Sequence, residues 1–252
     1  MMKPISIQLY SVRELAEEDF PGVLKRIAEI GYKGVEPAGL QGHSPRDVRK
    51  ILDDLGMVAS STHGPVPSEE NINELVETAQ ALGYDMVIAG RGKEHFQTRD
   101  DILKVAEEFQ KAAEMLKPHG LRMGYHNHWW ELDEVDGQYG LEIFLEAAPD
   151  VFSECDTYWA CNFGAVDVPA LVAKHKARMP ILHIKDGPLA QDEPHTAVGS
   201  GKMDVPAVVG AADPNVLEWL VVELDQCATD MMAAVAESYR YLTESGLAQG
   251  NK

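Results

Sequence analysis

The sequence has little of what membrane, secreted and disulfide-bonded proteins need. Its 252 residues contain no apolar run of about 18 residues, so we expect no membrane partner. The N-terminal stretch MMKPISIQLYSVRELAEED lacks the apolar segment and the small-residue cleavage site of a signal peptide. The three cysteines, Cys155, Cys161 and Cys227, are odd in number and show no CxxC spacing, which favours buried thiols in a cytoplasmic protein.

Positive charge is also scarce. The chain has 22 Lys and Arg against 41 Asp and Glu, a formal net charge of −19, and no basic run with interleaved aromatic residues. Nucleic-acid-binding proteins attach mainly by neutralising phosphates with Lys and Arg, so we expect no nucleic-acid partner. Most of the acidic charge is explained by solubility, and a neutral sugar or a cation suits such a chain better as a ligand.

Strand-like and helix-like runs alternate along the whole chain. The expected strands cover residues 5–12, 33–39, 58–66, 85–92, 122–128, 152–159, 180–187 and 217–225. Helical runs follow each of them; Ser44 is expected to cap one, Gly31 to end the first and Thr229 to cap the last. A doubly wound open sheet is the alternative, but the GxGxxG turn typical of that fold is absent. Eight such units predict a single-domain (β/α)₈ TIM barrel over residues 1–252.

Polar and titratable residues gather where the expected strands end. They are Glu36, His63, His126-Asn127-His128 with Glu131 beyond, Glu154, Asp156, Trp159, His183, Lys185, Asp186, Glu223 and Asp225. In a barrel of this kind the carboxyl ends of all strands meet at one mouth, where active sites lie. Each residue alone can be an ordinary paired polar group, but their joint occurrence at so many strand ends predicts a working site.

Two carboxylates and an imidazole, from Asp156, His183 and Glu223, are expected on three adjacent strands. This set suits one divalent cation such as Mn²⁺, Mg²⁺, Co²⁺ or Zn²⁺. A fourth ligand would come from the fifth strand, where His126, His128 and Glu131 are the candidates. Crowded carboxylates would repel one another without a compensating cation.

Other residues near the mouth have both a functional and a structural interpretation. Lys185 can stabilise an oxyanion or carry a proton, or it can only pair with a neighbouring carboxylate. Trp129, Trp130 and Trp159 can stack on a sugar ring or simply cap the barrel. We interpret VGSGKMD (198–204) as a flexible loop. The histidines expected on the surface are His119, His175 and His195. Arg91 is the one obvious arginine at a strand end, which disfavours a phosphorylated substrate.

Taken together, the segments GYHNHWWEL, ECDTYW, ILHIKDG, VGSGKMDVPAV and VVELDQ resemble the sugar phosphate isomerase/epimerase family with its xylose isomerase-like barrel. The resemblance runs from QLYSVR at 8–13 to the last helix. It is closest to the branch with HNHxxE on the fifth strand, which is similar to inosose dehydratases and to proteins acting on 3-keto-glycosides. The endonuclease branch of the fold needs a multi-zinc, His-rich cluster and a basic surface, which we do not find in the sequence.

The resemblance implies one catalytic divalent metal held by residues from strands five to eight. Asp156, His183 and Glu223 match three of the family's ligands. Many relatives have Glu at the end of strand five where this chain has His126; we prefer Glu131 as the fourth ligand and keep His126 as the alternative.

We therefore expect a metal-dependent sugar isomerase or epimerase that acts on a small polyhydroxy carbonyl compound through an enediolate. His128 or Glu223 would remove the proton, and Lys185 would stabilise the oxyanion. Glu131 would be a further catalytic residue. The expected substrate-binding residues are Glu36, His63, His126, Trp129 and Trp159.

Three alternatives stay open. A dehydratase or lyase acting on a keto-inositol or 3-keto-glycoside would use the same intermediate. A sugar-binding barrel without chemistry would need no metal, and a hydrolase would use metal-activated water. The expected partner is a small carbohydrate, and the chain is compatible with a homo-oligomer.

Overall fold

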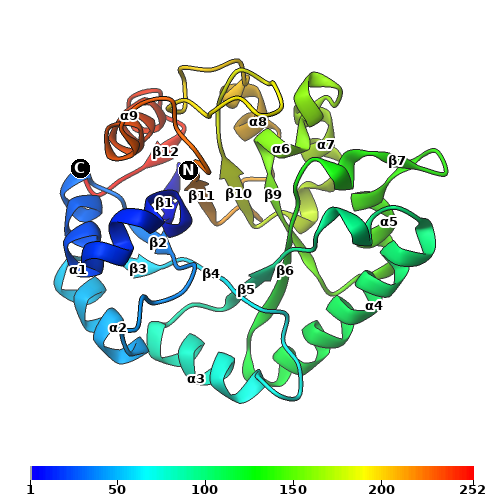
Figure 1. Ribbon diagram of the computed structural model, residues 1–252, viewed down its shortest axis with the longest axis horizontal. Helices are drawn as coiled ribbons and strands as arrows, with labels where there is room; N and C mark the ends of the chain where they lie inside the picture. The colour runs from blue at the N-terminus through cyan, green and yellow to red at the C-terminus, as the bar shows by residue number, and fades with distance from the viewer. Residues whose placement is uncertain (1) are drawn as a thin grey trace.

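The protein forms a nearly closed barrel of parallel strands with helices around it (Figure 1). The computed structural model describes residues 2–252. The strands of the barrel follow the order β3-β2-β1-β11-β10-β9-β6-β5-β4. Their bounds are β1 Lys3–Gln8, β2 Gly34–Glu36, β3 Val58–Ala59, β4 Thr62–His63, β5 Met86–Ala89, β6 Arg122–His126, β9 Phe152–Asp156, β10 Ile181–Ile184 and β11 Trp219–Val222.

The third barrel position is divided between β3 and β4. β3 pairs with β2 through Gly34 and Val58, whereas β4 pairs with β5 through Thr62 and Val87. Only Ser60 and Ser61 separate the two short strands, so one stretch of chain closes the ring by contacting both neighbours. The nine parallel strands of the described residues therefore fill eight barrel positions, which confirms the predicted (β/α)₈ architecture.

Helices cover the outside of the ring and bury their apolar faces against it (Figure 1). Their bounds are α1 Arg13–Ile30, α2 Pro45–Asp54, α3 Ile72–Leu82, α4 Arg99–Leu116, α5 Gly140–Ala147, α6 Thr157–Ala160, α7 Val168–His175, α8 Val205–Ala211 and α9 Met231–Glu244. Two short strands, β7 Glu134–Val135 and β8 Gln138–Tyr139, form a hairpin beside the barrel, and β12 Ala248–Gln249 pairs with β1.

Helix ends follow the sequence signals closely, with one correction. Ser44 caps α2 by accepting a hydrogen bond from the Asp47 amide, and Gly31 ends α1, both as expected. The cap of α9 is Asp230 and not Thr229, because the Asp230 carboxylate accepts from the amide of Ala233. A carboxylate at this position also interacts favourably with the positive end of the helix dipole.

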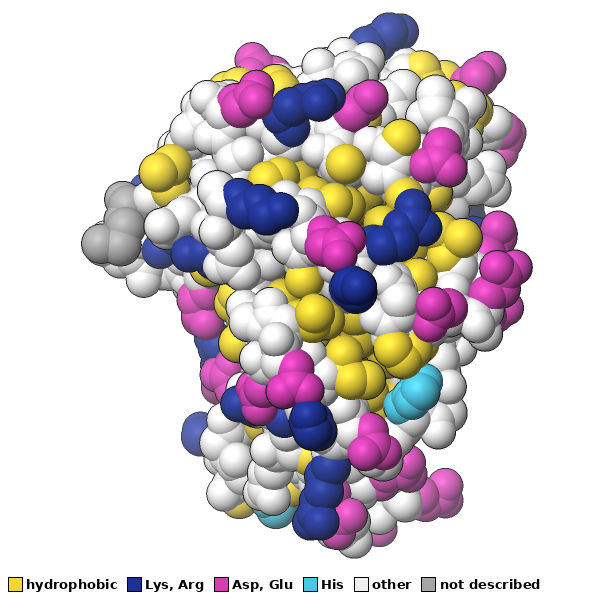
Figure 2. All heavy atoms as spheres, turned by 90° about the vertical axis from the view of Figure 1, so that its left-hand side faces the viewer, with side chains coloured by type: hydrophobic (Ala, Val, Ile, Leu, Met, Phe, Trp, Pro, Cys, Tyr) yellow, Lys and Arg dark blue, Asp and Glu magenta, His cyan; other side chains and the backbone are white. Residues whose placement is uncertain are grey.

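No helix within residues 2–252 combines the length and the apolar character that a membrane span requires. The face that holds α1 and α9 carries acidic and basic side chains mixed around an apolar patch (Figure 2). Charges of both signs are therefore interspersed on this face despite the net charge of −19.

Candidate functional site

A cavity of about 700 Å³ opens at the carboxyl ends of the strands. Nearly all the residues that line it follow a strand or belong to the loops beyond. They include His63, Arg91, His126, His128, Trp129, Trp130, Trp159, Phe163, Lys185, His195, Glu223 and Asp225. The structure thus brings most of the sequence-predicted site residues into one pocket, although they are spread over more than 160 positions of the chain.

Four side chains form a group that we call the upper set: His126, Asp156, His183 and Glu223. His126 and Glu223 line the cavity, and the other two are fully buried beside them. One donor atom from each lies within 4.8 Å of the others, and all four residues are buried. They come from the ends of β6, β9 and β10 and from the residue after β11. Neighbouring strands in the barrel order supply them, so the ring itself fixes their spacing.

The upper set leaves acceptor atoms facing one another. Asp156 Oδ1 accepts a hydrogen bond from the Trp159 amide at 2.9 Å and so caps α6. Its Oδ2 is buried, lies 2.8 Å from Nζ of Lys185, and lies 3.8 Å from Nε2 of His126. Burial lowers the pKa of His126 well below its usual value, so the ring is neutral. Two lone pairs that face each other in a buried pocket fit a bound divalent cation.

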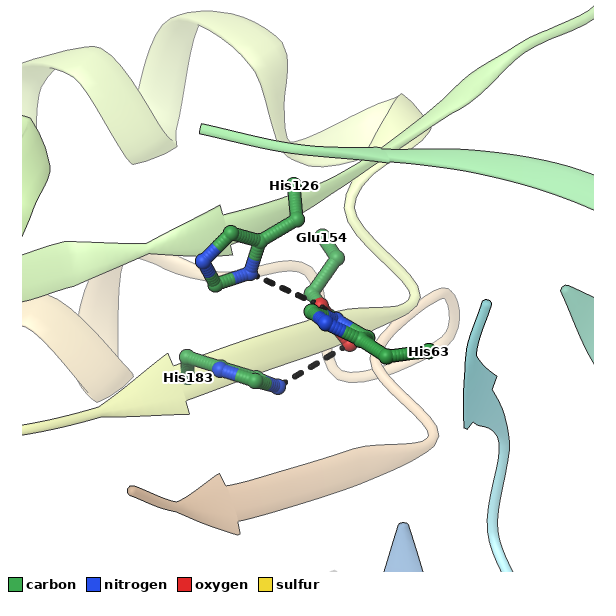
Figure 3. A group of neighbouring side chains, drawn as sticks. All are labelled: His63, His126, Glu154 and His183. Carbon is green, nitrogen blue, oxygen red and sulfur yellow. Dashed lines mark hydrogen bonds and ion pairs between the residues drawn. The ribbon is translucent and has the colours of Figure 1, made fainter. Parts of the chain in front are cut away.

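A second group, which we call the lower set, consists of His63, His126, Glu154 and His183, with Glu154 two residues before Asp156 on β9 (Figure 3). Three imidazoles surround the Glu154 carboxylate: His126 Nδ1 lies 2.9 Å from Oε2, His183 Nε2 lies 3.1 Å from Oε1, and His63 Nε2 also bonds Oε2. Burial opposes ionisation of Glu154, but His183 and His63 outweigh it and hold the pKa well below the usual value.

Glu154 is a central residue to which the sequence analysis assigned no role. It is two residues before Asp156, so both side chains point to the same side of β9. This two-residue spacing was the sequence signal that could have identified Glu154 as a site residue. A carboxylate inside an otherwise apolar buried strand is costly unless it is paired, so its presence indicates partners inside the barrel.

Glu36, at the end of β2, lies beside the lower set and not on the cavity wall. It accepts hydrogen bonds from Gln8 Nε2 at 2.5 Å and from the Ser61 hydroxyl, and His183 Nε2 lies 2.9 Å from its Oε1. Burial and the nearby Glu154 raise the pKa of Glu36. Our expectation that Glu36 contacts substrate is not supported, because the residue is fully buried and its oxygens already have partners.

His183, like His126, belongs to both sets. Its Nδ1 lies 2.8 Å from Glu223 Oε2, on the side opposite Nε2. Burial disfavours the charged ring, yet Glu154, Glu36 and Glu223 together raise the pKa of His183 well above its usual value.

Lys185 lies among three carboxylates at the edge of the upper set. Its Nζ is 2.8 Å from Asp156 Oδ2, 2.8 Å from Glu223 Oε2 and 2.9 Å from Asp225 Oδ2. The side chain is only 1% exposed. Burial opposes its charge, but Asp156, Asp225 and Glu223 raise the pKa of Lys185 well above the usual value. The ammonium group is thus charged and already neutralises part of the acidic site.

Glu131, our preferred fourth metal ligand, does not belong to either set. Both of its oxygens have partners: the Tyr125 hydroxyl donates to Oε1 at 2.7 Å and the His128 amide donates to Oε2 at 2.8 Å. It is fully buried, and the bond from the His128 amide ties it to the segment 126–128. The structure places the alternative, His126, in the upper set instead.

Aromatic rings form one wall of the cavity. Trp129 lies 5.1 Å from Trp159 and 5.8 Å from Phe163 between ring centres, and His128 stacks on Trp130 at 4.2 Å. Phe163 has a φ of +57°, which a non-glycine side chain rarely adopts. Our sequence reasoning missed Phe163, because no periodic pattern marks a residue in a short turn.

His195 was expected on the surface, and this expectation is wrong. The side chain is 3% exposed and packs between Tyr158 and Trp159 at the cavity wall. Its Nδ1 accepts a hydrogen bond from the Asp225 amide at 3.2 Å. Burial and the nearby Lys185 lower the pKa of His195 to about 4, so the ring is neutral at pH 7 and carries its proton on Nε2.

The segment 198–204, expected to be flexible, is tied to the barrel by one carboxylate. Asp186 accepts hydrogen bonds from the amides of Gly199, Gly201 and Met203 at 2.9–3.0 Å. Asp186 directly follows the Lys185 strand end and is itself buried. The loop therefore has a defined path next to the mouth.

Comparison with known proteins places this architecture in a family. The sequence profile described as "Xylose isomerase-like TIM barrel" matches residues 24–244. The chain belongs to this family. No curated protein matches the sequence.

Among solved structures, this xylose isomerase-like barrel is similar to a sugar phosphate isomerase/epimerase from Parabacteroides distasonis, with 26% identity, a TM-score of 0.81, and coverage of 99% of this chain and 96% of the other. The IolI protein with a bound zinc atom is 14% identical at a TM-score of 0.75 and covers 96% and 98%. A barrel from Mycobacterium smegmatis in complex with magnesium is also 14% identical, at a TM-score of 0.71, and covers 98% of each chain. These last two similarities concern the fold.

Proposed function

We propose that this barrel is a divalent-metal-dependent sugar isomerase or epimerase that moves a proton beside the carbonyl group of a polyhydroxy compound. The observation that carries the proposal is the upper set, in which two carboxylates and two imidazoles meet and from which His126 and Glu223 line an open cavity. Family membership and the similarity to a sugar phosphate isomerase/epimerase support the same class of reaction.

His126, Asp156, His183 and Glu223 would hold the cation. Mixed nitrogen and oxygen ligands suit Mn²⁺, Co²⁺ or Zn²⁺, and Mg²⁺ accepts the carboxylates. When bound, the cation would supply a Lewis acid next to the sugar's carbonyl and hydroxyl oxygens, which acidifies the neighbouring C–H bond.

The substrate that fits the cavity is an unphosphorylated sugar. Arg91 and Lys185 are the lining residues in the described chain with a permanent positive charge, and both already pair with carboxylates. Arg91 donates to Glu108 through Nη2 at 2.5 Å and through Nε at 3.2 Å. A phosphate group needs free guanidinium or backbone donors, which these pairs do not offer. The wall of Trp129 and Trp159 instead suits the C–H face of a sugar ring.

Two lining residues can carry the proton. Glu223 is ionised, because Lys185 and His183 outweigh the effect of burial and lower its pKa well below the usual value. His128 also lines the cavity, stacked on Trp130, and its side chain is one-third exposed. One of them removes the proton from carbon, and the proton returns to the neighbouring carbon in isomerisation or to the opposite face in epimerisation.

Two further side chains can bind the oxygens of the substrate. Lys185 donates to the oxygen that becomes negative as the proton leaves. The neutral His195 presents Nε2–H as a donor near Trp159, where a hydroxyl group of the ring would lie.

A lyase or dehydratase is the second candidate, and His126 is the observation that favours it. The upper set contains one glutamate, Glu223, so a scheme with two glutamates on opposite faces of one carbon lacks its second member. With His128 as the second proton carrier, loss of a β-leaving group from the same enediolate gives elimination on a keto-inositol or 3-keto-glycoside.

The test uses Asp156→Ala with Asp167→Ala as the matched control, because Asp167 caps α7 just as Asp156 caps α6. Binding of Mn²⁺ is measured by calorimetry, and proton transfer is measured as deuterium uptake from D₂O into ketoses, aldoses and 3-keto-sugars. We expect Asp156→Ala to lose both cation binding and deuterium uptake, whereas Asp167→Ala retains both.

A wild-type protein without Mn²⁺ affinity would contradict the proposal. So would an Asp156→Ala protein that still binds sugar as well as the wild type while neither protein exchanges a C–H proton, which is the behaviour of a binding barrel. Uptake with release of a β-substituent would assign the lyase reaction.

A further inference from the structure

Tyr10 is an aromatic lining residue that is separate from the aromatic wall around Trp129. It belongs to the short helix η1, Leu9–Val12, which follows β1, whereas Trp129 follows β6. The barrel positions between β1 and β6 are β11, β10 and β9 on one side, and β2, the β3–β4 segment and β5 on the other (Figure 1). The cavity therefore has aromatic side chains on two opposite sides of its mouth.

Neighbouring residues hold Tyr10 in place and leave part of it free. Its amide donates to Gln8 Oε1 at 3.0 Å, and the guanidinium group of Arg13 lies over its ring, 4.1 Å from the ring centre. Arg13 also donates to the carbonyl oxygens of Tyr10 and Asp225 at 2.8–3.1 Å, which ties η1 to the chain after β11. Tyr10 is nevertheless 44% exposed. One face of its ring is thus covered by Arg13, and the other face is free to contact a ligand.

One stretch of chain links the upper set to the Tyr10 side of the cavity. Glu223 belongs to the upper set, and Asp225 and Gln226, which soon follow it, also line the cavity. This stretch lies next to η1 because β11 and β1 are paired neighbours. Gln226 is exposed, and its side-chain amide can both donate to hydroxyl groups and accept from them. A ligand bound at the upper set can therefore extend along this stretch towards Tyr10.

The cavity is larger than a single sugar needs. A hexose has about a dozen non-hydrogen atoms, and even at the roughly 30 Å³ that a water molecule occupies in the liquid they would fill about 360 Å³. The cavity volume is about 700 Å³, within the range of sites that hold drug-sized ligands. A hexose that lies against Trp129 and Trp159 with its carbonyl group at the upper set would therefore leave the Tyr10 side unfilled.

The charges along the cavity favour an uncharged group on the Tyr10 side. Asp192, Glu193 and Asp225 all line the cavity. Arg91 and Lys185 line it as well, but both are already paired with carboxylates. A second phosphate or carboxylate in this space would be repelled by the acidic lining residues.

We propose that the cavity takes a substrate of two linked rings. The first ring is the sugar that reacts, with its carbonyl group at the upper set and its apolar face against Trp129 and Trp159. The second is an uncharged ring, joined to the first through a glycosidic oxygen, that stacks on the free face of Tyr10. The inference rests on the proposed function for the chemistry at the first ring. It adds the substrate class, which is a glycoside whose second ring is a sugar or an aromatic group.

The first experiment compares one-ring and two-ring ligands that contain no carbonyl group, so that binding is read without turnover. Saturation-transfer NMR and calorimetry on the full-length protein are applied to methyl β-glucoside, methyl β-cellobioside and 4-nitrophenyl β-glucoside. We expect at least one two-ring ligand to bind on the order of tenfold more tightly than methyl β-glucoside, with saturation of protons on both of its rings. The tighter of the two identifies the second ring as a sugar or as an aromatic group.

Two results overturn the proposal. One is that neither two-ring ligand binds more tightly than methyl β-glucoside. The other is that saturation stays confined to one ring of the ligand, which would show that the Tyr10 side of the cavity holds only water.

The second experiment compares Tyr10→Ala with Tyr10→Phe, which keeps the ring, and with Leu103→Ala as the control. Leu103 is 40% exposed and lies on α4, outside the barrel. We expect Tyr10→Ala to lower the ratio of two-ring to one-ring affinity about tenfold and to remove saturation of the second ring. Tyr10→Phe and Leu103→Ala should keep the wild-type ratio. An unchanged ratio in Tyr10→Ala overturns the inference.

These readouts do not depend on proton transfer. A protein that binds two-ring ligands through Tyr10 but exchanges no C–H proton in D₂O would contradict the proposed function and leave this inference intact. A protein that exchanges protons in free ketoses but shows no preference for two-ring ligands would contradict this inference alone.

Discussion

At each end of the barrel a cationic side chain lies among carboxylates, but one of these side chains is exposed to solvent and the other is buried. At the amino end, Arg122 at the start of β6 donates to Glu218 at 2.7 and 3.0 Å and to Asp85 at 2.9 Å, and its side chain is 37% exposed. At the carboxyl end, Lys185 contacts three carboxylates at similar distances but is 1% exposed.

This difference shows where the fold depends on charge. Exposed ion pairs contribute little to stability, because water already solvates both partners. Buried charges are costly to leave unpaired, so a buried cluster persists only where the surrounding structure balances it. In this fold the carboxyl end is the working end, and the amino end contributes mainly to stability. The following predictions test this contrast between Lys185 and Arg122.

The largest effect is expected for Lys185→Met. The variant removes the ammonium group from Asp156, Glu223 and Asp225 while keeping an apolar side chain of similar length. We expect the metal-free protein to lose about 3–5 kcal/mol of unfolding free energy near pH 7, because the buried carboxylates lose their counter-charge. Urea unfolding measures this loss, and deuterium uptake from D₂O into sugars should disappear. A loss below about 1 kcal/mol would mean that the cluster is solvated like a surface pair.

The sequence could reveal the parts of the site that strand placement determines, but not the parts that depend on side-chain packing or on loops. Asp156, His183 and Glu223 interrupt apolar strands at their ends, so strand placement alone predicts their meeting. Glu154 carries the same kind of signal, but it does not stand at the very end of its strand, and its three imidazole partners depend on side-chain packing. Glu131 shows the limit most clearly, because its two hydrogen bonds to Tyr125 and His128 depend on a loop path that spacing does not encode.

The fold was more predictable than the site for a physical reason. Alternating strand and helix patterns repeat eight times, and the apolar character of each strand reports burial on both faces. Loops carry no such periodicity. His195 and Phe163 reach the cavity from loops, and the ordering of 198–204 depends on a single buried carboxylate, Asp186.

An intermediate effect is expected for the pH dependence of stability in His195→Gln. The pKa of His195 is about 4 in the folded protein, against an ordinary value of 6.5, because of burial and Lys185. Between these values the unfolded chain binds a proton that the folded chain does not, so stability is fully present above pH 6.5 and falls towards pH 4. Glutamine can keep the hydrogen bond from the Asp225 amide without titrating, so the variant should lose on the order of 1–3 kcal/mol less than the wild type over this range.

Urea unfolding at a series of pH values measures this difference, with His119→Gln as the control because His119 lies on the surface. Parallel curves for the wild type and His195→Gln would show that His195 gains its proton at the same pH in both states and that the cavity wall is well solvated.

The smallest effect is expected for Arg122→Met, the counterpart of Lys185→Met at the amino end. The variant breaks the pairs with Glu218 and Asp85, but water can solvate both carboxylates once the guanidinium is gone. We expect a loss of about 0.5–1 kcal/mol in urea unfolding, further reduced in high salt, with cation binding and deuterium uptake unchanged. Arg122 also lies over the Phe152 ring at 5.8 Å, a contact that methionine can partly replace. A loss of unfolding free energy as large as that of Lys185→Met would show that the loss depends on carboxylate pairing and not on burial. The two ends of the barrel would then not differ in how much their ion pairs stabilise the fold.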